Sequence, residues 1–171
     1  YHFGILLAML DFSRYYNAVK YIEGLANLQS GPNYMSGGHH DPSVYIKRIQ
    51  WFLNLLGNPE RGFKFIHITG TAGKGTVATM MQNVLVKSVR TTGLFTSPFV
   101  TTSIEKIQVN ELYIAPDEFA QIVEEMKPAI DEAFAKCPWG GPSYFERFLA
   151  IALVYFRQQK CEWVVLEVGC G

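Results

Sequence analysis

The residues best suited to chemistry in this sequence are residues 69–76, Thr-Gly-Thr-Ala-Gly-Lys-Gly-Thr, directly behind the apolar run 65–68. A short β-type run, clustered glycines with one lysine, and helix-compatible residues from Val77 onward predict a strand, a tight loop and a helix. This geometry aims backbone N–H groups and a helix N-terminus at one point, which favours an anion there. Lys74 adds a positive charge and Thr76 a hydroxyl, so we interpret the stretch as a cradle for a nucleotide triphosphate.

The stretch departs from the generic phosphate-binding loop in two ways. The generic pattern has a glycine five residues before the Gly-Lys pair, where this chain has Ile68, and a Ser or Thr directly after the lysine, where it has Gly75. The alternative is a glycine-rich turn in which Lys74 is merely solvated. The candidate phosphate-binding residues are Gly70, Thr71, Ala72, Gly73, Lys74, Gly75 and Thr76.

A carboxylate and a hydroxyl follow two other predicted strands. Glu167 interrupts an apolar run near its carboxyl end, which is costly for a charge unless it is paired or binds a metal. Mg²⁺ prefers oxygen ligands and bridges protein to nucleotide phosphates, so Glu167 and the Ser97 hydroxyl are candidate ligands. The alternatives are a glutamate that caps a helix or reaches solvent, and a serine that serves ordinary turn chemistry before Pro98.

Other polar residues have structural explanations as well as functional ones. Glu146 could contact a substrate, although its spacing from Ser143 is that of a helix capping box, which would account for it fully. Tyr144 and Phe145 beside it are expected to form core or the wall of a groove. The adjacent histidines 39–40 could bind a metal, but no suitably spaced Cys, Asp or Glu accompanies them. Glu105 and Lys106 are expected to be solvated charges on a hairpin.

Composition excludes several classes of protein. The chain has 171 residues, of which 49% are hydrophobic and 18% charged, as expected for one globular domain. Its formal net charge is zero, which argues against nucleic-acid or anionic-membrane partners. The apolar stretch 5–10 is too short to span a bilayer. The three cysteines contain no C-x-x-C pair, so free thiols in a reducing cytosol are the simplest interpretation.

The remaining sequence predicts alternating helices and strands. Ser13 is expected to N-cap a helix to about Leu28, and Pro116 to open a helix to about Lys136. Predicted helices are 13–28, 41–56, 75–88, 116–136 and 143–159; predicted strands are 65–68, 92–95, two within 105–114, and 163–168. This order predicts an α/β fold, a mostly parallel sheet with helices on both faces. Ligands of such sheets bind at the carboxyl ends of the strands, which here carry the 70–76 loop, Ser97 and Glu167.

Taken together, these segments resemble the N-terminal ATPase domain of the folylpolyglutamate synthases and dihydrofolate synthases, within the Mur ligase superfamily of ATP-dependent amide-forming ligases. The form Gly-Thr-x-Gly-Lys-Gly-[Ser/Thr] explains both departures from the generic loop. The segments that carry the resemblance are 16–22, 56–59, 66–76, 93–98, 105–110, 142–146 and 166–169. The resemblance implies the P-loop-type central domain of a Mur ligase, over residues 1–171, truncated before the rest of the sheet and the C-terminal glutamate-ligase domain.

The resemblance also implies roles and substrates. Residues 70–76 would hold ATP, with Lys74 stabilising the transferred phosphate, and Ser97 and Glu167 would bind Mg²⁺. ATP would phosphorylate the γ-carboxylate of a folate, and L-glutamate would attack the acyl phosphate; dihydropteroate is a possible further acceptor. Substrate-side candidates are Phe99, Tyr144, Phe145 and Glu146. A cytoplasmic monomer is implied. The chain begins at Tyr1 without methionine and stops at Gly171 shortly after a strand, so it is expected to be part of a larger protein and inactive alone.

This chain differs from the family pattern at three positions. The family usually has Asn at Ala72, His at Phe99 and Arg at Lys106, and the Phe99 difference concerns substrate positioning more than nucleotide binding. Two alternatives therefore stay open. One is a Mur-type ligase with a non-folate acceptor, which the folate-branch segments 56–59 and 143–146 disfavour. The other is a nucleotide-binding module without catalysis.

Overall fold

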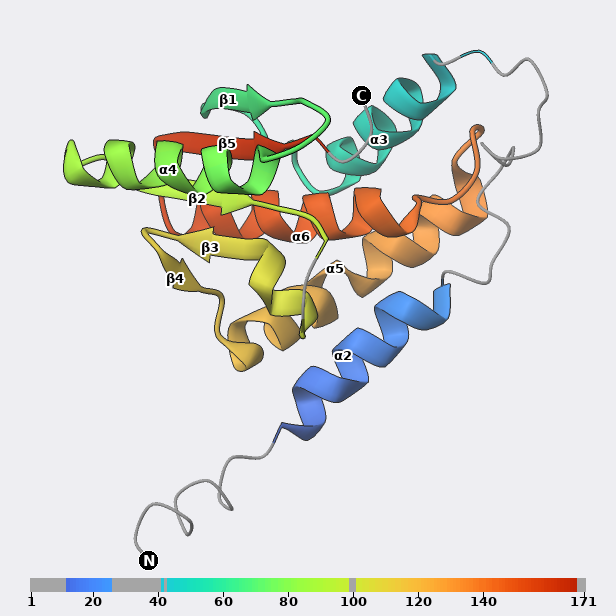
Figure 1. Cartoon of the computed structure of the whole chain (residues 1–171). Helices are drawn as coiled ribbons and strands as arrows, with labels where there is room; N and C mark the ends of the chain where they lie inside the picture. The colour runs from blue at the N-terminus through green and yellow to red at the C-terminus, as the bar shows by residue number, and fades with distance from the viewer. Residues whose placement is uncertain (1–11, 26–40, 42, 99–100, 169–171) are drawn as a thin grey trace, which may run out of the picture.

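Five short runs of the sequence form the strands of one sheet in the computed structural model, which describes residues 12–25, 41, 43–98 and 101–168 (Figure 1). The strands are β1 (Lys64–Ile68), β2 (Thr92–Phe95), β3 (Ile107–Val109), β4 (Leu112–Tyr113) and β5 (Trp163–Glu167). The helices are α2 (Ser13–Gly24), α3 (Ser43–Leu55), α4 (Lys74–Lys87), α5 (Pro116–Lys136) and α6 (Tyr144–Gln158), with a 3-10 turn, η3 (Ser103–Lys106).

The sheet is mixed, with strand order β1-β5-β2-β3-β4. β1, β5 and β2 are parallel, whereas β3 and β4 form an antiparallel hairpin beside β2. In the parallel register Ile68 lies opposite Glu167, and Phe95 lies opposite Leu166. The carboxyl ends of the three parallel strands therefore meet at one edge, as expected from the sequence.

Helices cover both faces of the sheet, as predicted (Figure 1). α4 packs on one face through a small core of Ala78, Leu94 and Val165. The larger core lies on the opposite face, where α6 packs against the sheet and α2, α3 and α5 pack around it. Gly93 permits this close approach, because a Cβ there would lie 2.7 Å from the Phe156 ring of α6.

The α/β prediction is confirmed, and several local expectations need correction. Phe12 rather than Ser13 occupies the N-cap position of α2, and no side-chain hydrogen bond caps that end. Two of the five residues of β1 are half-buried and three are exposed, because its outer edge pairs with no other strand among the described residues. The hairpin begins at Ile107, so Glu105 and Lys106 belong to η3.

The prediction that Glu105 and Lys106 are solvated is wrong. Glu105 accepts hydrogen bonds from the backbone N–H groups of Thr101 and Thr102, at 3.0 and 2.8 Å, and so caps η3. The side chain of Lys106 is buried, with 6% of the residue exposed. The contact that buries it involves α6, about forty residues further along the chain, which local spacing does not reveal.

Candidate nucleotide-binding site

The loop after β1 remains open to solvent. Residues 69–73 are exposed, and Lys74 and Gly75, at the start of α4, are half-buried. Gly73 occupies the N-cap position with φ 72°, a left-handed conformation that glycine adopts without strain. The first turn of α4 itself contains no acidic residue. These features fit an anion-binding loop.

Lys74 lies over its own loop. Its Nζ donates a hydrogen bond to the Gly70 carbonyl oxygen at 2.9 Å. This contact folds the flexible side chain back across the residues that form the cradle, where an ammonium group can reach a phosphate by a small rotation. Thr76 is exposed on the first turn of α4, close to the same loop.

The carboxylate of Glu167 joins the loop to the turn after β2. Its Oε2 accepts a hydrogen bond from the Ser97 backbone N–H at 3.0 Å. The same oxygen lies 3.5 Å from the position that a Cβ would occupy at Gly75. Glu167 itself is 6% exposed. The structure thus brings Glu167, Ser97 and the start of α4 together, as the sequence predicted.

The donor chemistry of this corner suits a hard divalent cation. A buried carboxylate beside a hydroxyl-bearing residue and an anion-binding loop offers oxygen ligands only, which is the preference of Mg²⁺. Because Mg²⁺ keeps several waters and binds phosphate oxygens, it needs few protein ligands. Within the described residues no group of three or more His, Cys, Asp or Glu side chains is arranged to hold a metal ion. Glu167 and Ser97 are the residues of this corner that fit such an ion.

Tyr144 and Phe145, in the first turn of α6, form an aromatic surface close to the same edge of the sheet, which we call the aromatic wall. Phe145 is 39% exposed, and its ring packs edge-on against Phe95, the last residue of β2, with ring centroids 5.5 Å apart. Tyr144 is half-buried and packs against Phe148, at 4.8 Å between centroids. Phe99 and the histidines 39–40 lie outside the described residues. Among the described residues predicted to contact the substrate, Phe145 presents an exposed aromatic surface next to the end of β2.

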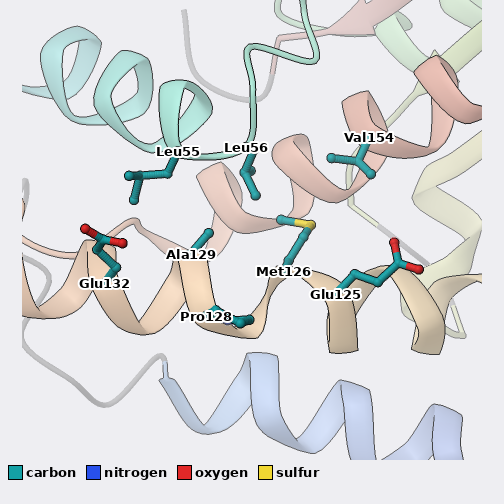
Figure 2. Close-up of a pocket in the computed structure, with 8 residues that line it drawn as sticks. All are labelled: Leu55, Leu56, Glu125, Met126, Pro128, Ala129, Glu132 and Val154. Atoms are coloured by element: carbon teal, nitrogen blue, oxygen red, sulfur yellow. The ribbon is translucent and has the colours of Figure 1, made fainter.

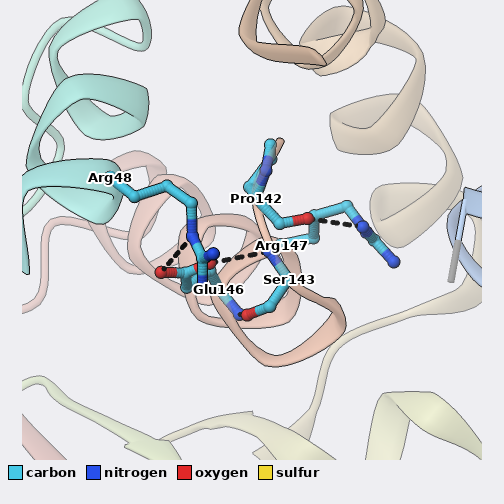
Figure 3. A network of polar contacts seen from close by, with 5 residues as sticks. All are labelled: Arg48, Pro142, Ser143, Glu146 and Arg147. Atoms are coloured by element: carbon cyan, nitrogen blue, oxygen red, sulfur yellow. Dashed lines mark hydrogen bonds and ion pairs between the residues drawn. The ribbon is translucent and has the colours of Figure 1, made fainter. Parts of the chain in front are cut away.

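Glu146 faces the protein interior. It closes the predicted capping box, accepting from the Ser143 N–H at 2.6 Å while Ser143 Oγ accepts from the Glu146 N–H at 3.3 Å. Its carboxylate also forms a buried ion pair with Arg48 of α3, at 2.8 Å from Nε to Oε2 (Figure 3). The capping box alone therefore does not account for Glu146. Sequence reasoning missed Arg48, although its spacing four residues before the buried Phe52 places it on the inner face of α3.

Arg147 completes this buried polar network. Its guanidinium donates to the carbonyl oxygens of Pro142, at 2.6 Å, and of Ile22 in α2, at 3.1 Å. It is fully buried, which lowers the pKa of the guanidinium from its usual value. Arg48, Glu146 and Arg147 thus tie α2, α3 and the start of α6 together (Figure 3).

A separate cavity lies far from the loop. It has a volume of about 440 Å³ and lies between α3, α5 and α6 (Figure 2). Its lining is mainly apolar, with the carboxylates of Glu125 and Glu132 at its margin. Val154, which lines it, is ten residues along α6 from Tyr144. The cavity contains none of the candidate phosphate, metal or substrate residues, so it is not part of the site described above.

Comparison with known proteins identifies the relatives of this fold and site. No family model matches the chain. It is 35% identical over 127 residues to the dihydrofolate synthase/folylpolyglutamate synthase of Bacillus subtilis, an alignment that covers 74% of this chain and 29% of the relative. The chain therefore spans less than a third of the length of that relative.

Solved structures agree with the sequence comparison. The folylpolyglutamate synthase of Mycobacterium tuberculosis complexed with ADP superposes with a TM-score of 0.77 at 29% identity, covering 92% of this chain and 33% of that one. A folylpolyglutamate synthase complex with AMPPCP and folate superposes with a TM-score of 0.74 at 33% identity, covering 92% and 35%. The fold of this chain is the fold of a corresponding third of those enzymes.

Proposed function

Because the chain belongs to the folylpolyglutamate synthase and dihydrofolate synthase family, we propose that it is the nucleotide-binding part of a ligase that joins L-glutamate to a folate. In the proposed reaction, ATP phosphorylates the γ-carboxylate of the folate, and the amine of glutamate displaces phosphate from the acyl phosphate. Dihydropteroate is a second candidate acceptor, supported by the dihydrofolate synthase activity in the name of the Bacillus relative.

The observation that carries this proposal is the convergence of Glu167, Ser97 and Gly75 beneath the loop after β1. In the proposed site, residues 70–76 hold the phosphates of ATP through backbone N–H groups. Lys74 moves from the Gly70 carbonyl to the transferred phosphate and stabilises its developing charge. Ser97 and Glu167 hold Mg²⁺, which when bound neutralises phosphate charge and orients the nucleotide.

The acceptor side of the proposed site is formed by the first turn of α6. Phe145 offers an exposed aromatic face beside the end of β2, where a planar pteridine or benzoyl ring could stack. Tyr144 supports that turn from behind. Phe99 would belong to this side as well, on the family resemblance alone. Glu146 stabilises this turn by capping α6 and by its ion pair with Arg48. Both of its carboxylate oxygens therefore accept hydrogen bonds from protein donors.

The proposed partners are small molecules only. We propose a cytoplasmic monomer without a nucleic-acid or membrane partner, supported by the zero net charge. No helix in the described part of the chain has the length and apolarity needed to cross a membrane. Because the chain spans only a third of its relatives, we expect the 171-residue chain alone to bind nucleotide without ligating glutamate.

Calorimetric titration with Mg·ATP tests the proposed site. The wild-type chain is expected to bind, and Lys74→Ala to bind about tenfold to hundredfold more weakly, because a charge-assisted contact to phosphate is lost. Lys87→Ala, an exposed lysine at the far end of α4, is the matched control and should bind like wild type. Equal affinity of the Lys74→Ala and wild-type chains, with both folded, would refute the assignment of the cradle.

A further inference from the structure

The buried cation Lys106 links two parts of the site that are distant in sequence. Its backbone carbonyl oxygen accepts a hydrogen bond from the Thr96 N–H at 3.0 Å, directly before Ser97. Its side chain reaches the other way, to the first turn of α6, where Nζ donates to the Tyr144 hydroxyl at 3.3 Å. One residue therefore contacts both the turn that carries Ser97 and the turn that carries Tyr144 and Phe145.

The ammonium group of Lys106 lies over two aromatic rings. Its Nζ is 4.5 Å from the Tyr144 ring centroid and 4.2 Å from that of Phe148. A cation over an aromatic face is attracted by the negative charge of the ring face, and the attraction is stronger when the pair is removed from water. Burial lowers the pKa of Lys106, an effect that the Glu23 carboxylate partly opposes. The buried cation thus contacts two aromatic rings of α6, one of which belongs to Tyr144.

The other end of the same turn is held independently. Glu146 is fixed by Arg48 and Ser143, and the next residue, Arg147, is fixed by carbonyl oxygens on either side. Tyr144 and Phe145 lie between Ser143 and Glu146 in the sequence, which are hydrogen-bonded to each other. Phe145 is the exposed member, and its ring packs edge-on against Phe95 at the end of β2. We infer that the residues that anchor its neighbours help to hold this ring against the end of β2, two residues before Ser97.

We propose that Lys106 is a positioning residue for the acceptor substrate: it couples the Ser97 turn to the first turn of α6 and so sets the affinity of the aromatic wall for a folate. This inference rests on the proposed function, since it takes a folate as the ligand of that wall. Lys106 does not contact the nucleotide in this role. Its removal should therefore weaken folate binding selectively.

The test titrates folate and Mg·ATP separately into wild type, Lys106→Met, Lys106→Arg and the control Lys87→Met. Quenching of the intrinsic tryptophan fluorescence reports folate, calorimetry reports Mg·ATP, and circular dichroism checks folding. Lys106→Met should bind folate about tenfold more weakly and Mg·ATP within about twofold of wild type. Lys106→Arg keeps a cation and a donor, and should restore folate affinity to within about threefold. Lys87→Met should match wild type.

Several results would overturn the proposal. A loss of both ligands in parallel, or an unchanged folate affinity in Lys106→Met, would contradict selective positioning. If a folded Lys106→Arg variant binds folate as weakly as Lys106→Met, the positive charge of Lys106 is not what positions the aromatic wall. Mg·ATP binding without folate binding by the wild type would also refute it, whereas binding of neither ligand would refute the proposed function itself. If Lys106→Met does not fold, Tyr144→Phe removes only the hydroxyl partner, and should weaken folate binding about threefold with Mg·ATP binding intact.

Discussion

Two polar regions lie near the carboxyl ends of the parallel strands, and they differ in how far their polar groups are exposed and bonded within the protein. In the loop after β1, residues 69–73 are exposed and Lys74 donates a hydrogen bond to the Gly70 carbonyl oxygen of its own loop. At the start of α6, Arg48, Glu146 and Arg147 are at least nine-tenths buried and bonded to one another or to backbone. We propose that the first region binds a ligand through its polar groups, whereas the second uses its polar groups to hold the protein together.

The contrast predicts which quantity each substitution changes. A change in the buried network should lower the free energy of unfolding, because unpaired buried charges are costly. A change in the exposed loop should alter ligand affinity with little effect on folding, because surface substitutions usually change stability by less than about 0.5 kcal/mol. Variants that change the free energy of unfolding and the ligand affinity together would contradict the contrast between the two regions.

The largest expected effect belongs to Arg48→Met. It leaves the Glu146 carboxylate buried without its cation, and should lower the free energy of unfolding by about 3–5 kcal/mol. The double variant Arg48→Met/Glu146→Gln removes both charges and should recover part of that loss. Urea denaturation monitored by circular dichroism measures both. A single variant as stable as wild type would show that the pair has no structural role.

Ser143→Ala gives a smaller effect at the same turn. It removes the side-chain acceptor for the Glu146 N–H and should cost about 1 kcal/mol, the usual value for an N-cap. Ser143→Asp keeps an acceptor but adds a charge beside Glu146, so Ser143→Thr is the better control and should lose less. A Thr variant as unstable as the Ala variant would contradict the capping assignment.

Gly75→Ala sharpens the contrast in the opposite direction. Alanine favours helix over glycine by about 0.5–1 kcal/mol, and the new Cβ would meet Glu167 Oε2 at an ordinary 3.5 Å, so stability should rise slightly. The methyl group would occupy space between the loop and the proposed metal ligand, so Mg·ATP should bind several-fold more weakly. Denaturation and calorimetry on the same sample test both expectations. Tighter Mg·ATP binding would exclude a ligand from that corner.

Alkaline pH should lower the stability of the fold through Cys161, a buried thiol between α6 and β5. Burial raises the pKa of the Cys161 thiol to about 12, above 9.0 for an exposed thiol, so the folded chain keeps a proton that the unfolded chain releases. The contribution to stability is complete below pH 9.0 and is lost as the pH rises toward about 12. Urea denaturation at several pH values should show a shallower loss above pH 9.0 in Cys161→Ala than in wild type. Identical slopes would contradict this.

Local sequence signals predicted the parts of the fold that local chemistry determines. Pro116 and the acidic pair after it indicated a helix that the structure bounds at the predicted residues, Pro116–Lys136. Thr92–Phe95 was bounded correctly as well, and the Ser143–Glu146 capping box is present. The loop after β1 could be predicted because its glycines and lysine all lie within the eight residues 69–76.

Contacts between distant residues could not be predicted in the same way. Arg48 and Glu146 are 98 residues apart, and neither carries a local sign that the other will neutralise it. Lys106 looked like a solvated charge because its aromatic neighbours come from α6. The misplaced N-cap at Ser13 has a similar cause, since α2 is stabilised mainly by packing against α5 and α6 rather than by its end. The sequence thus indicated the exposed site better than its buried support.

The most direct test compares Glu167, which lies beside the start of α4 at the end of the loop, with Glu146 of the buried network. Glu167→Gln and Glu146→Gln make the same chemical change, and both side chains are buried to a similar degree, 6% and 8% exposed. Each is titrated with ATP in the presence and absence of Mg²⁺, and each is unfolded in urea.

Glu167→Gln should lose about tenfold to hundredfold in ATP affinity only when Mg²⁺ is present, with a free energy of unfolding within about 1 kcal/mol of wild type. Glu146→Gln should lose stability by several kcal/mol, because Arg48 remains buried, while the folded chain binds Mg·ATP within about twofold of wild type. If Glu167→Gln is destabilised and binds Mg·ATP normally, Glu167 is a structural residue and the proposed metal corner is wrong.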